Sequence, residues 1–443
     1  MYFKTQPDYG YKPFLVPGGG QEGRPYITRI APQGDIVEFE WYDLADRDND
    51  ACTVFLTYDY VKYEKIRIKG NRCSIRVAQE RDGAFYLETD DGRQSNRRPF
   101  RSGYYPGKVI AYNHPDDKQY DYSGVYLGSP SIVRLENGDL LASFDYFAVA
   151  QGMNLSTLLR STDDGDTWKF VTDIFPSMWA TLFTVGNRVY IATASKEYGD
   201  MQILESLDNG ESWHGIVLDR GIGQYMNMGY HKAPTPVVKH NGRIYIAIEY
   251  GSWGKGKFMP AVYSIDEHAD FMDIGQWVRT PLFALEQNEY PLIVPWGAIE
   301  GNMVEMPDGT LVDILRHSQD KAVVLALDES NPAGKLRFFT TMDFAAAYTK
   351  FHIIKHDKKY YAMGNPSPYR NRLVLYVSDD ALHWKEEKTL IDLSDYSAKL
   401  VGVQYPSFFI EDGVAYAVIR TAFNGADDFH NNNCITFHKF KLT

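Results

Sequence analysis

Acidic, basic and phenolic residues stand at the ends of apolar runs in this chain. Glu249 closes the run Ile244–Ile248, Glu300 lies just before Met303–Met306, and His231 and Tyr405 each precede a further run. A pair of carboxylates can cleave a glycosidic bond, one of them as the general acid. Histidine and tyrosine can transfer protons in hydrolysis or in β-elimination from a uronate. We therefore predict His231, Glu249, Glu300 and Tyr405 as catalytic residues.

A second set of polar residues follows a regular spacing. Seven positions after a turn residue (Gly138, Gly242, Gly309, Lys358 or Gly413) stand Asp145, Glu249, Arg316, Asn365 and Arg420. Two arginines at equivalent positions can grip one carboxylate with paired hydrogen bonds. The predicted substrate-binding residues are Arg316, Arg420, Asp145, Trp179, Lys196, Asn302, Lys350, Asn365, Gln404 and His430.

Six pairs of short apolar runs carry these residues. The pairs are Ser131–Arg134 with Leu140–Ser143, Leu182–Val185 with Val189–Thr193, Thr235–Val238 with Ile244–Ile248, Met303–Met306 with Leu311–Leu315, His352–Lys355 with Tyr360–Met363, and Phe408–Ile410 with Val414–Ile419. Each pair has a turn between its runs, which is typical of β-hairpins. Repeated strand-rich units of this length predict a six-bladed β-propeller. The start of the first strand and the end of the second then lie on one face of every blade.

A repeated corner motif supports this fold. Ser161-Thr162-Asp163-Asp164-Gly165-Asp166-Thr167-Trp168 recurs 45 residues later as Ser206–Trp213, and a weaker copy spans Ser378–Trp384. Asp and Asn bond nearby backbone, Gly permits positive φ, and Trp packs back on the sheet. The motif therefore predicts a tight structural corner and does not specify a reaction.

The first hundred residues show a different pattern. Short alternating runs such as Tyr26–Ile30, Ile36–Trp41, Thr53–Tyr58 and Ser74–Val77 are separated by polar turns. This pattern is typical of an immunoglobulin-like or fibronectin-like sandwich. We predict a β-sandwich over residues 1–104, with a flexible start, and the propeller over residues 105–443.

The motifs together resemble the sialidase-like (Asp-box) β-propeller family of carbohydrate-active enzymes. The resemblance rests on the corner motifs and on Gly128–Ser131, Ala142–Asp145, His231–Pro236, Glu300–Asn302 and Thr436–His438. It implies an all-β fold, a six-bladed propeller behind a sandwich, and relatives in style such as ulvan lyases and rhamnose–glucuronate-cleaving propellers. It also implies that the corner motifs join the third and fourth strands, on the face opposite the ligand.

Two departures from that family affect the expected activity. The Arg-Ile-Pro of true sialidases is missing near the start of the propeller, and Phe144 stands where many relatives have histidine. The substrate can therefore be an acidic glycoside other than a sialate. The alternative that the protein has lost catalytic activity also remains.

Composition bounds the partners. The net charge of −12 opposes binding to nucleic acid, which needs a basic surface. No run is long and apolar enough to span a membrane, and no leader segment is apparent, so the sequence predicts a cytoplasmic protein. Three cysteines argue against a disulfide framework, and no metal-ligand spacing or phosphate loop suggests a metal or cofactor. The oligomeric state is not indicated.

The sequence therefore predicts a carbohydrate-active enzyme that cleaves a small acidic oligosaccharide of the uronate or sialate type. Hydrolysis by a glycoside hydrolase and elimination by a lyase both fit the candidate residues. The alternative is a sugar-binding propeller without catalytic activity, which Phe144 suggests.

Overall fold

The computed structural model describes residues 23–43, 45, 50–120, 122–148, 152–285, 296–318 and 320–442. These residues form strands joined by turns, and the one helical element among them is the short 3-10 turn η1 (Ile274–Gln276). The prediction of an all-β chain is therefore confirmed. The first 22 residues, where a flexible start is predicted, lie outside the described residues.

Two antiparallel sheets come first along the chain. One has the order β1 (Pro25–Gln33), β2 (Ile36–Asp43), β5 (Arg72–Arg76), and the other has the order β4 (Glu64–Lys69), β3 (Ala51–Thr57), β6 (Asp82–Glu88), β7 (Arg98–Arg101). Their inner faces meet, since the rings of Phe39 and Phe85 lie 5.0 Å apart. The alternating runs predicted four of these strands, whereas β4, β6 and β7 carry too many charged or turn-forming residues to stand out.

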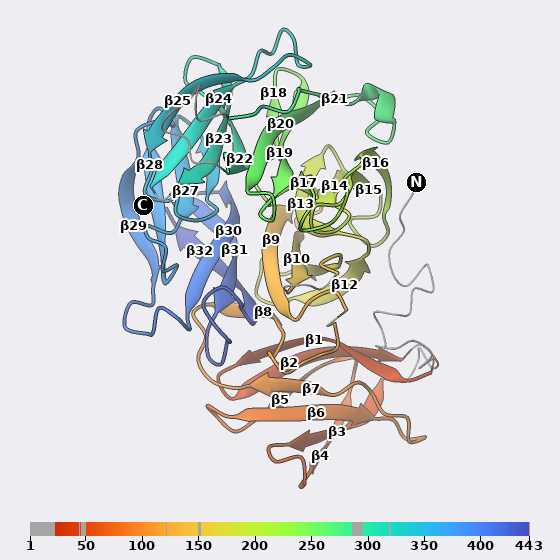
Figure 1. Ribbon diagram of the computed structural model, residues 1–443. Helices are drawn as coiled ribbons and strands as arrows, with labels where there is room; N and C mark the ends of the chain where they lie inside the picture. The colour runs from red at the N-terminus through yellow and green to blue at the C-terminus, as the bar shows by residue number, and fades with distance from the viewer. Residues whose placement is uncertain are drawn as a thin grey trace.

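Six further sheets follow, and Figure 1 shows them arranged around a common centre above the two N-terminal sheets. From the innermost strand outwards, the first two are β9 (Tyr126–Arg134), β10 (Leu140–Phe147), β11 (Ser156–Ser161), β12 (Lys169–Ile174), and β13 (Met178–Val185), β14 (Arg188–Ala194), β15 (Met201–Ser206), β16 (His214–Asp219). The third has an interrupted inner strand, β17 (Gly229–His231) and β18 (Val238–His240), and continues with β19 (Arg243–Ser252), β20 (Lys257–Asp266), β21 (Val278–Arg279).

The last three sheets repeat the pattern. They are β22 (Ile299–Glu305), β23 (Leu311–Ser318), β24 (Lys321–Ala326), β25 (Arg337–Asp343); β26 (His352–His356), β27 (Lys359–Gly364), β28 (Arg372–Ser378), β29 (Lys385–Asp392); and β30 (Gly402–Glu411), β31 (Val414–Ala422), β32 (Cys434–Lys441), β8 (Lys108–Tyr112). Five of the predicted pairs fall in the first two strands of their sheets, whereas in the third sheet the predicted run Thr235–Val238 overlaps the inner strand β18 only at Val238. The outer strand of the sixth sheet comes from far earlier in the chain, because β8 pairs with β32.

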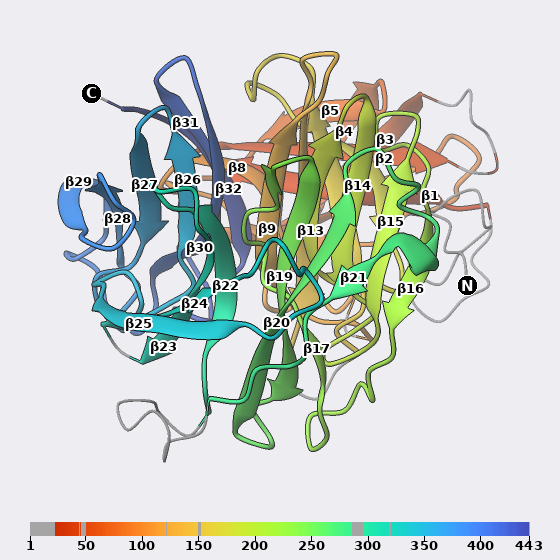
Figure 2. The ribbon, with the colours of Figure 1, turned by 90° about the horizontal axis from the view of Figure 1, so that it is seen from above.

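Neighbouring sheets pack through shared hydrophobic clusters. Innermost strands contact each other from β22 to β26, β26 to β30, and β30 back to β9. The first and second sheets share a cluster containing Leu141 and Ile191, and the second and third share one containing Ile203 and Ile246. The view from above in Figure 2 shows the inner strands running roughly alongside one another. Their ends therefore meet on one face of the molecule.

The repeated motif forms the corner between the third and fourth strands of three sheets. Ser161 Oγ accepts the Gly165 N–H at 2.8 Å, Asp163 accepts the Thr167 N–H at 2.8 Å, and Trp168 donates its indole N–H to the Gly165 carbonyl at 3.1 Å. Trp213 and Trp384 donate in the same way. Because strands alternate in direction, these corners lie on the face opposite the start of the innermost strands.

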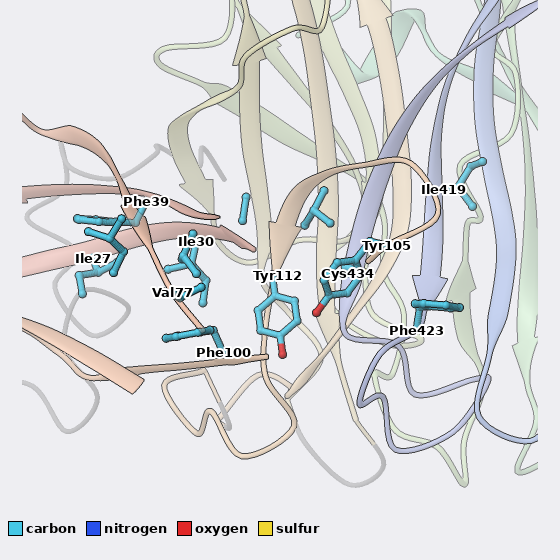
Figure 3. Close-up of a cluster of buried hydrophobic side chains, with 14 of the residues drawn as sticks. Ile27, Ile30, Phe39, Val77, Phe100, Tyr105, Tyr112, Ile419, Phe423 and Cys434 are labelled. Atoms are coloured by element: carbon cyan, nitrogen blue, oxygen red, sulfur yellow. The ribbon is translucent and has the colours of Figure 1, made fainter. Parts of the chain in front are cut away.

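The N-terminal sheets and the sixth propeller sheet share one hydrophobic core. Figure 3 shows Phe39 and Phe100 on one side of it, and Tyr105, Phe423 and Cys434 on the other. The predicted domain boundary falls between β7 and β8, in the middle of this shared core. The cysteines Cys52, Cys73 and Cys434 are free.

Candidate functional site

Four innermost strands open with the same backbone irregularity. Ser129, Trp179, Glu300 and Tyr405 have φ values of 45°, 62°, 61° and 51°, in the left-handed region that side chains other than Gly rarely adopt. At each of these residues the pairing with the second strand slips, which is a β-bulge. Bulges redirect side chains and are common beside active sites. Here they turn four side chains towards a common cavity.

The cavity has a volume of about 190 Å³ and lies where the inner strand ends meet. Its walls are formed by Ser129, Phe147, Met153, Met178, Trp179, Glu197, Tyr198, His231, Ala233, Trp253, Ile299, Glu300, Arg316, Tyr405, Arg420 and His430. This volume is below the ~300–1,000 Å³ of pockets for drug-sized ligands, so we expect it to enclose one sugar ring. Mixed aromatic and charged walls suit a sugar, which has apolar faces and polar edges.

Tyr405 and Glu300 form the central pair of one side. The Tyr405 hydroxyl donates to Glu300 Oε1 at 2.7 Å, and Arg316 Nη1 donates to Glu300 Oε2 at 3.1 Å. Burial opposes ionisation of Glu300, but Arg316, His231 and the bond from Tyr405 outweigh it and hold its pKa below the ordinary value. Burial and Glu300 raise the pKa of Tyr405. The pair is thus a neutral phenol beside an ionised carboxylate that can accept its proton.

Two more arginines surround Tyr405. The Arg420 guanidinium lies 4.2 Å from the Phe147 ring centre and 5.1 Å from the Tyr405 ring centre, and Arg370 donates to Gln404 Oε1 at 2.5 Å. Among the described residues, neither Arg370 nor Arg420 has a carboxylate within ion-pair distance. We call Arg316, Arg420 and Tyr405, which line the cavity, together with Arg370, which bonds Gln404 and does not line the cavity, the arginine wall.

The positive charge of this wall lowers the pKa of titratable groups beside it. Burial, with Arg370 nearby, lowers the pKa of Arg420 to about 10. Arg420, together with burial, lowers the pKa of His430 to about 3, so the His430 ring is neutral at ordinary pH. Uncompensated positive charge in a closed site favours an anionic ligand.

His231 and Glu249 form the central pair of the opposite side. His231 Nδ1 and Glu249 Oε2 are 2.7 Å apart, and the Trp179 ring packs edge-on against the imidazole at 4.5 Å. The other oxygen of Glu249 accepts the Gly301 N–H at 3.0 Å, directly after Glu300. The imidazole is thus held from two directions, and His231 lines the cavity. We call His231, Trp179 and Glu197, which line the cavity, together with Glu249, which bonds His231, the histidine wall.

Glu197 lines the cavity beside His231. It follows β14 in the loop that ends at Asp200, and its backbone N–H bonds the Met153 carbonyl at 3.2 Å. Burial raises its pKa, and His231 acts in the opposite direction. A carboxyl group with a raised pKa can serve as a proton donor.

Several predicted binding residues lie behind the cavity instead of in its wall. Asp145, Asn302, Lys350, Asn365 and Gln404 are fully buried, and their polar atoms bond backbone or neighbouring side chains. These five side chains do not line the cavity, and their predicted contact with a substrate stays a prediction. The strand-end rule found their position on the right face but could not tell a lining side chain from one directed into the core.

These buried residues hold the cavity residues in place. Asp145 accepts the Trp179 N–H at 2.7 Å, and Asn302 donates to the Glu300 carbonyl at 3.0 Å. Lys350 donates to the carbonyl of Pro406, next to Tyr405. Each bond fixes backbone at a bulge or immediately beside one.

Two other predictions also need correction. Lys196 is exposed and outside the cavity wall, and the next residue, Glu197, takes the place expected for it. Glu249 reaches the cavity only through His231 and does not line it.

Phe144 also has a place that the sequence did not reveal. It is buried in a hydrophobic cluster with Tyr146 and does not line the cavity. It therefore gives no reason to expect loss of catalysis.

Sequence reasoning missed Arg370 and Glu197. Arg370 lies in the loop between β27 and β28, outside any strand, and Glu197 lies in a similar loop after β14. Strand-end counting cannot reach such residues, although an Asn-Pro turn followed by arginine was a signal for the first.

Comparisons with known proteins bear on the fold. Neither a family model nor a curated protein sequence matches the chain. Solved structures do: the Hadza microbial sialidase Hz136 has a TM-score of 0.53 at 11% identity, covering 94% of this chain and 95% of that one. A leech intramolecular trans-sialidase has a TM-score of 0.52 at 10% identity, covering 100% and 93%. An α-L-arabinanase of Penicillium chrysogenum has 0.50 at 13% identity, covering 76% and 98%.

These likenesses show that the chain has the sialidase-like β-propeller fold, as the resemblance in the sequence implied. At such low identity they establish the fold and leave the reaction to be argued from the site.

The described residues contain no helix that is long and apolar enough to cross a membrane. They also contain no group of three or more His, Cys, Asp or Glu side chains arranged to hold a metal ion.

Proposed function

We propose that this protein is a glycoside hydrolase that releases an acidic sugar residue from a small oligosaccharide. The observation that carries the proposal is the Tyr405–Glu300 hydrogen bond of 2.7 Å inside a cavity walled by arginine. The solved structures of the same fold include sialidases and an arabinanase, which act on glycosides.

The proposed fold is a closed six-bladed propeller with an N-terminal sandwich. The six sheets would be its blades, with β8 closing the ring on the sixth, and the sandwich would span residues 1–104. The contact of β30 with β9 supports the closure. In this arrangement the cavity is the mouth of the central channel, where propellers usually bind ligands.

The acidic substrate follows from the arginine wall. Arg370 and Arg420 have no carboxylate partner among the described residues, and Arg370 Nε has no hydrogen-bond partner in the structure. A substrate carboxylate can satisfy both guanidinium groups and neutralise their charge. A uronate and a sialate both carry such a group.

Tyr405 is proposed as the nucleophile. Its oxygen attacks the anomeric carbon while its proton passes to Glu300, and the bond to the leaving oxygen breaks. Glu300 is suited to this role because its lowered pKa keeps it ionised. The product of this step is an aryl glycoside of Tyr405, with Glu300 carrying the phenol proton and the leaving oxygen protonated by His231.

His231 is proposed as the proton donor to the leaving oxygen and then as the base for water. In the first step Nε2–H of the imidazolium gives its proton to the leaving oxygen, with Glu249 stabilising the ring charge. In the second step water attacks the anomeric carbon, gives a proton to Nε2, and Tyr405 leaves and recovers its proton from Glu300. Two displacements retain the anomeric configuration.

The test uses 4-methylumbelliferyl glycosides of sialate, glucuronate, galacturonate and arabinofuranose. We expect turnover of at least one acidic glycoside, an initial product of retained configuration by proton NMR, and no turnover by Tyr405→Phe. Preference for the neutral arabinofuranoside would contradict the acidic substrate. An unsaturated uronate product would instead identify a lyase, and tight binding of the acids without turnover would identify a sugar-binding protein.

A further inference from the structure

Four large apolar side chains are exposed on two loops beside the histidine wall. Ile222, Tyr225 and Met226 lie between β16 and β17 and are 56%, 53% and 63% exposed, and Trp253 lies between β19 and β20 and is 41% exposed. A cluster of exposed apolar side chains marks an interaction site more often than a passive surface. We call these four residues the aromatic rim.

The two loops are fixed against each other and against the cavity wall. A Cβ on Gly254 would lie 2.2 Å from the Tyr225 carbonyl oxygen, so their backbones are in contact. The buried Tyr198 bonds both loops: its carbonyl accepts the Gly223 N–H at 2.6 Å, and its hydroxyl accepts the Trp253 N–H at 3.4 Å. The rim is therefore arranged before any ligand binds.

The rim is continuous with the cavity. Trp253 lines the cavity itself, its ring centre lies 5.3 Å from that of Trp296, and Tyr198 lies 5.9 Å from Trp179, which packs on His231. The Phe258 ring centre lies 5.6 Å from that of His231 and 5.0 Å from that of Trp253, so a ligand that extends out of the cavity past His231 comes close to Trp253. His231 is the proposed donor to the leaving oxygen, so this side is where the leaving sugar must lie.

The chemistry of the rim suits an uncharged sugar ring. Tyr and Trp present flat apolar faces for the C–H face of a pyranose, and the amides of Gln224 and Asn227, which bond each other at 2.7 Å, supply polar contacts beside them. Glu197 lines the cavity on this side, and it disfavours a second carboxylate. The three arginines stand on the opposite wall.

We propose that the aromatic rim binds a neutral sugar ring on the leaving-group side of the cavity. The inference rests on the proposed function for its orientation and deepens it: the substrate is an acidic residue linked to a neutral sugar. The arginine wall then selects the acid, and Trp253 with Tyr225 selects the sugar attached to it.

The experiment measures binding of separate halves by saturation-transfer NMR and titration. The neutral probes are methyl β-galactoside, methyl β-glucoside and methyl α-rhamnoside, and the acidic probes are free glucuronate and free sialate. Trp253→Ala and Tyr225→Ala test the rim, Arg420→Ala tests the arginine wall, and Phe339→Ala, at an exposed aromatic on β25 away from the cavity, is the matched control.

We expect at least one neutral glycoside to bind together with an acidic one. Trp253→Ala and Tyr225→Ala should each weaken the neutral probe about tenfold, the scale of a lost aromatic contact. Tyr225→Ala, at a residue outside the cavity wall, should leave the acidic probe unchanged. Arg420→Ala should do the reverse, and Phe339→Ala should change neither.

Absence of binding by all three neutral glycosides, or equal binding by wild type and both rim variants, overturns the inference. Loss of neutral binding in Phe339→Ala as well overturns it too. Because the readout is binding, failure of the proposed hydrolysis appears separately, as intact binding of both halves without turnover of the linked sugars.

Discussion

The two walls of the cavity differ in whether their charged side chains have partners within the protein. In the histidine wall the protein supplies its own partners: Glu249 pairs with His231 at 2.7 Å and with the Gly301 N–H at 3.0 Å. In the arginine wall two cations have no such partner, because neither Arg370 nor Arg420 has a carboxylate within ion-pair distance among the described residues. A satisfied pair is ready to move a proton, whereas an unsatisfied cation is ready to bind an anion.

The difference explains why one wall can recognise and the other can react. Burying an unpaired charge costs free energy, and that cost is recovered when a ligand supplies the opposite charge. The arginine wall is therefore expected to determine affinity for acids. The histidine wall, whose charges are already compensated, is expected to affect turnover with little effect on binding.

The walls are joined at Glu300 and Gly301. Glu300 bonds Arg316 and Tyr405, while the next N–H bonds Glu249 of the other wall. Gly301 permits this closeness, since a Cβ there would lie 2.3 Å from an Asp313 oxygen. The expected size of a substitution's effect thus depends on whether it changes the junction at Glu300 and Gly301, one of the walls, or a buried residue behind a wall.

The largest effect is expected at the junction. Tyr405→Phe removes the proposed nucleophile and should lower kcat by about 10⁴-fold or more, as loss of a nucleophile does in other enzymes. Glu300→Gln should cost nearly as much, and the double variant little more, because the two act as one unit. Steady-state and single-turnover kinetics measure this. Additive losses would show that the two residues work separately.

A smaller and more selective effect is expected in the histidine wall. His231→Ala or Glu249→Gln should lower kcat by about 10²–10⁴-fold, the usual worth of general acid–base catalysis. The loss should shrink for an aryl leaving group, which needs little protonation, and KM should change little. Glu197→Gln is the matched comparison. A larger loss there than in His231→Ala would transfer the proton-donor role to Glu197.

The sequence predicted the framework of this site better than its surface. Strand pairs and the corner motif identified the fold, and the entrances of the inner strands placed His231, Glu300 and Tyr405 on one face. The same rule also selected Asn302 and Lys350, whose side chains are buried and do not line the cavity. Period-two alternation tells which face of a sheet a residue occupies, but a bulge changes the direction of the side chain, and bulges have no clear sequence signal here.

Loop residues were beyond reach for a different reason. Arg370 and Glu197 are placed by turns whose geometry depends on distant contacts, such as the bond from Arg370 to Gln404. Tertiary packing decides such positions, and local pattern does not encode it.

The next prediction concerns the affinity for acidic sugars, which the arginine wall is expected to determine. Arg420→Ala should weaken binding of an acidic sugar by roughly 1.5–3 kcal/mol, the range for a charged hydrogen bond, and Arg370→Ala by a similar amount. Arg316→Ala is less clean, because it also leaves Glu300 without its cation. Calorimetric titration with glucuronate and sialate gives the values. Unchanged affinity in both Arg370→Ala and Arg420→Ala would remove the proposed carboxylate site.

The smallest effect concerns the support behind the histidine wall, where Asp145 accepts the Trp179 N–H. Burial raises the pKa of Asp145 to about 7, against an ordinary value of about 4 in the unfolded chain. Between these values the folded chain keeps a proton that the unfolded chain has lost. The folded state binds more protons in this window, so Asp145 makes stability fall as pH rises from about 4 to about 7. Asp145→Asn should therefore gain stability relative to wild type as the pH rises through the window, by about 1.4 kcal/mol for each pH unit.

The opposite sign is expected at a corner on the far face. Bonds from Thr167 and Ser161 outweigh partial burial and lower the pKa of Asp163, so its contribution is present above about pH 4 and is lost as the pH falls. Asp163→Asn should thus lose stability relative to wild type at neutral pH and lose less in acid. Urea unfolding of the wild type and both variants at several pH values between about 3 and 8 gives the two slopes, the one for Asp163 below pH 4 and the one for Asp145 above it. If the free energy of unfolding of Asp145→Asn and of wild type changed equally with pH, Asp145 would be ionised in the folded protein. The Trp179 N–H would then donate to a buried carboxylate.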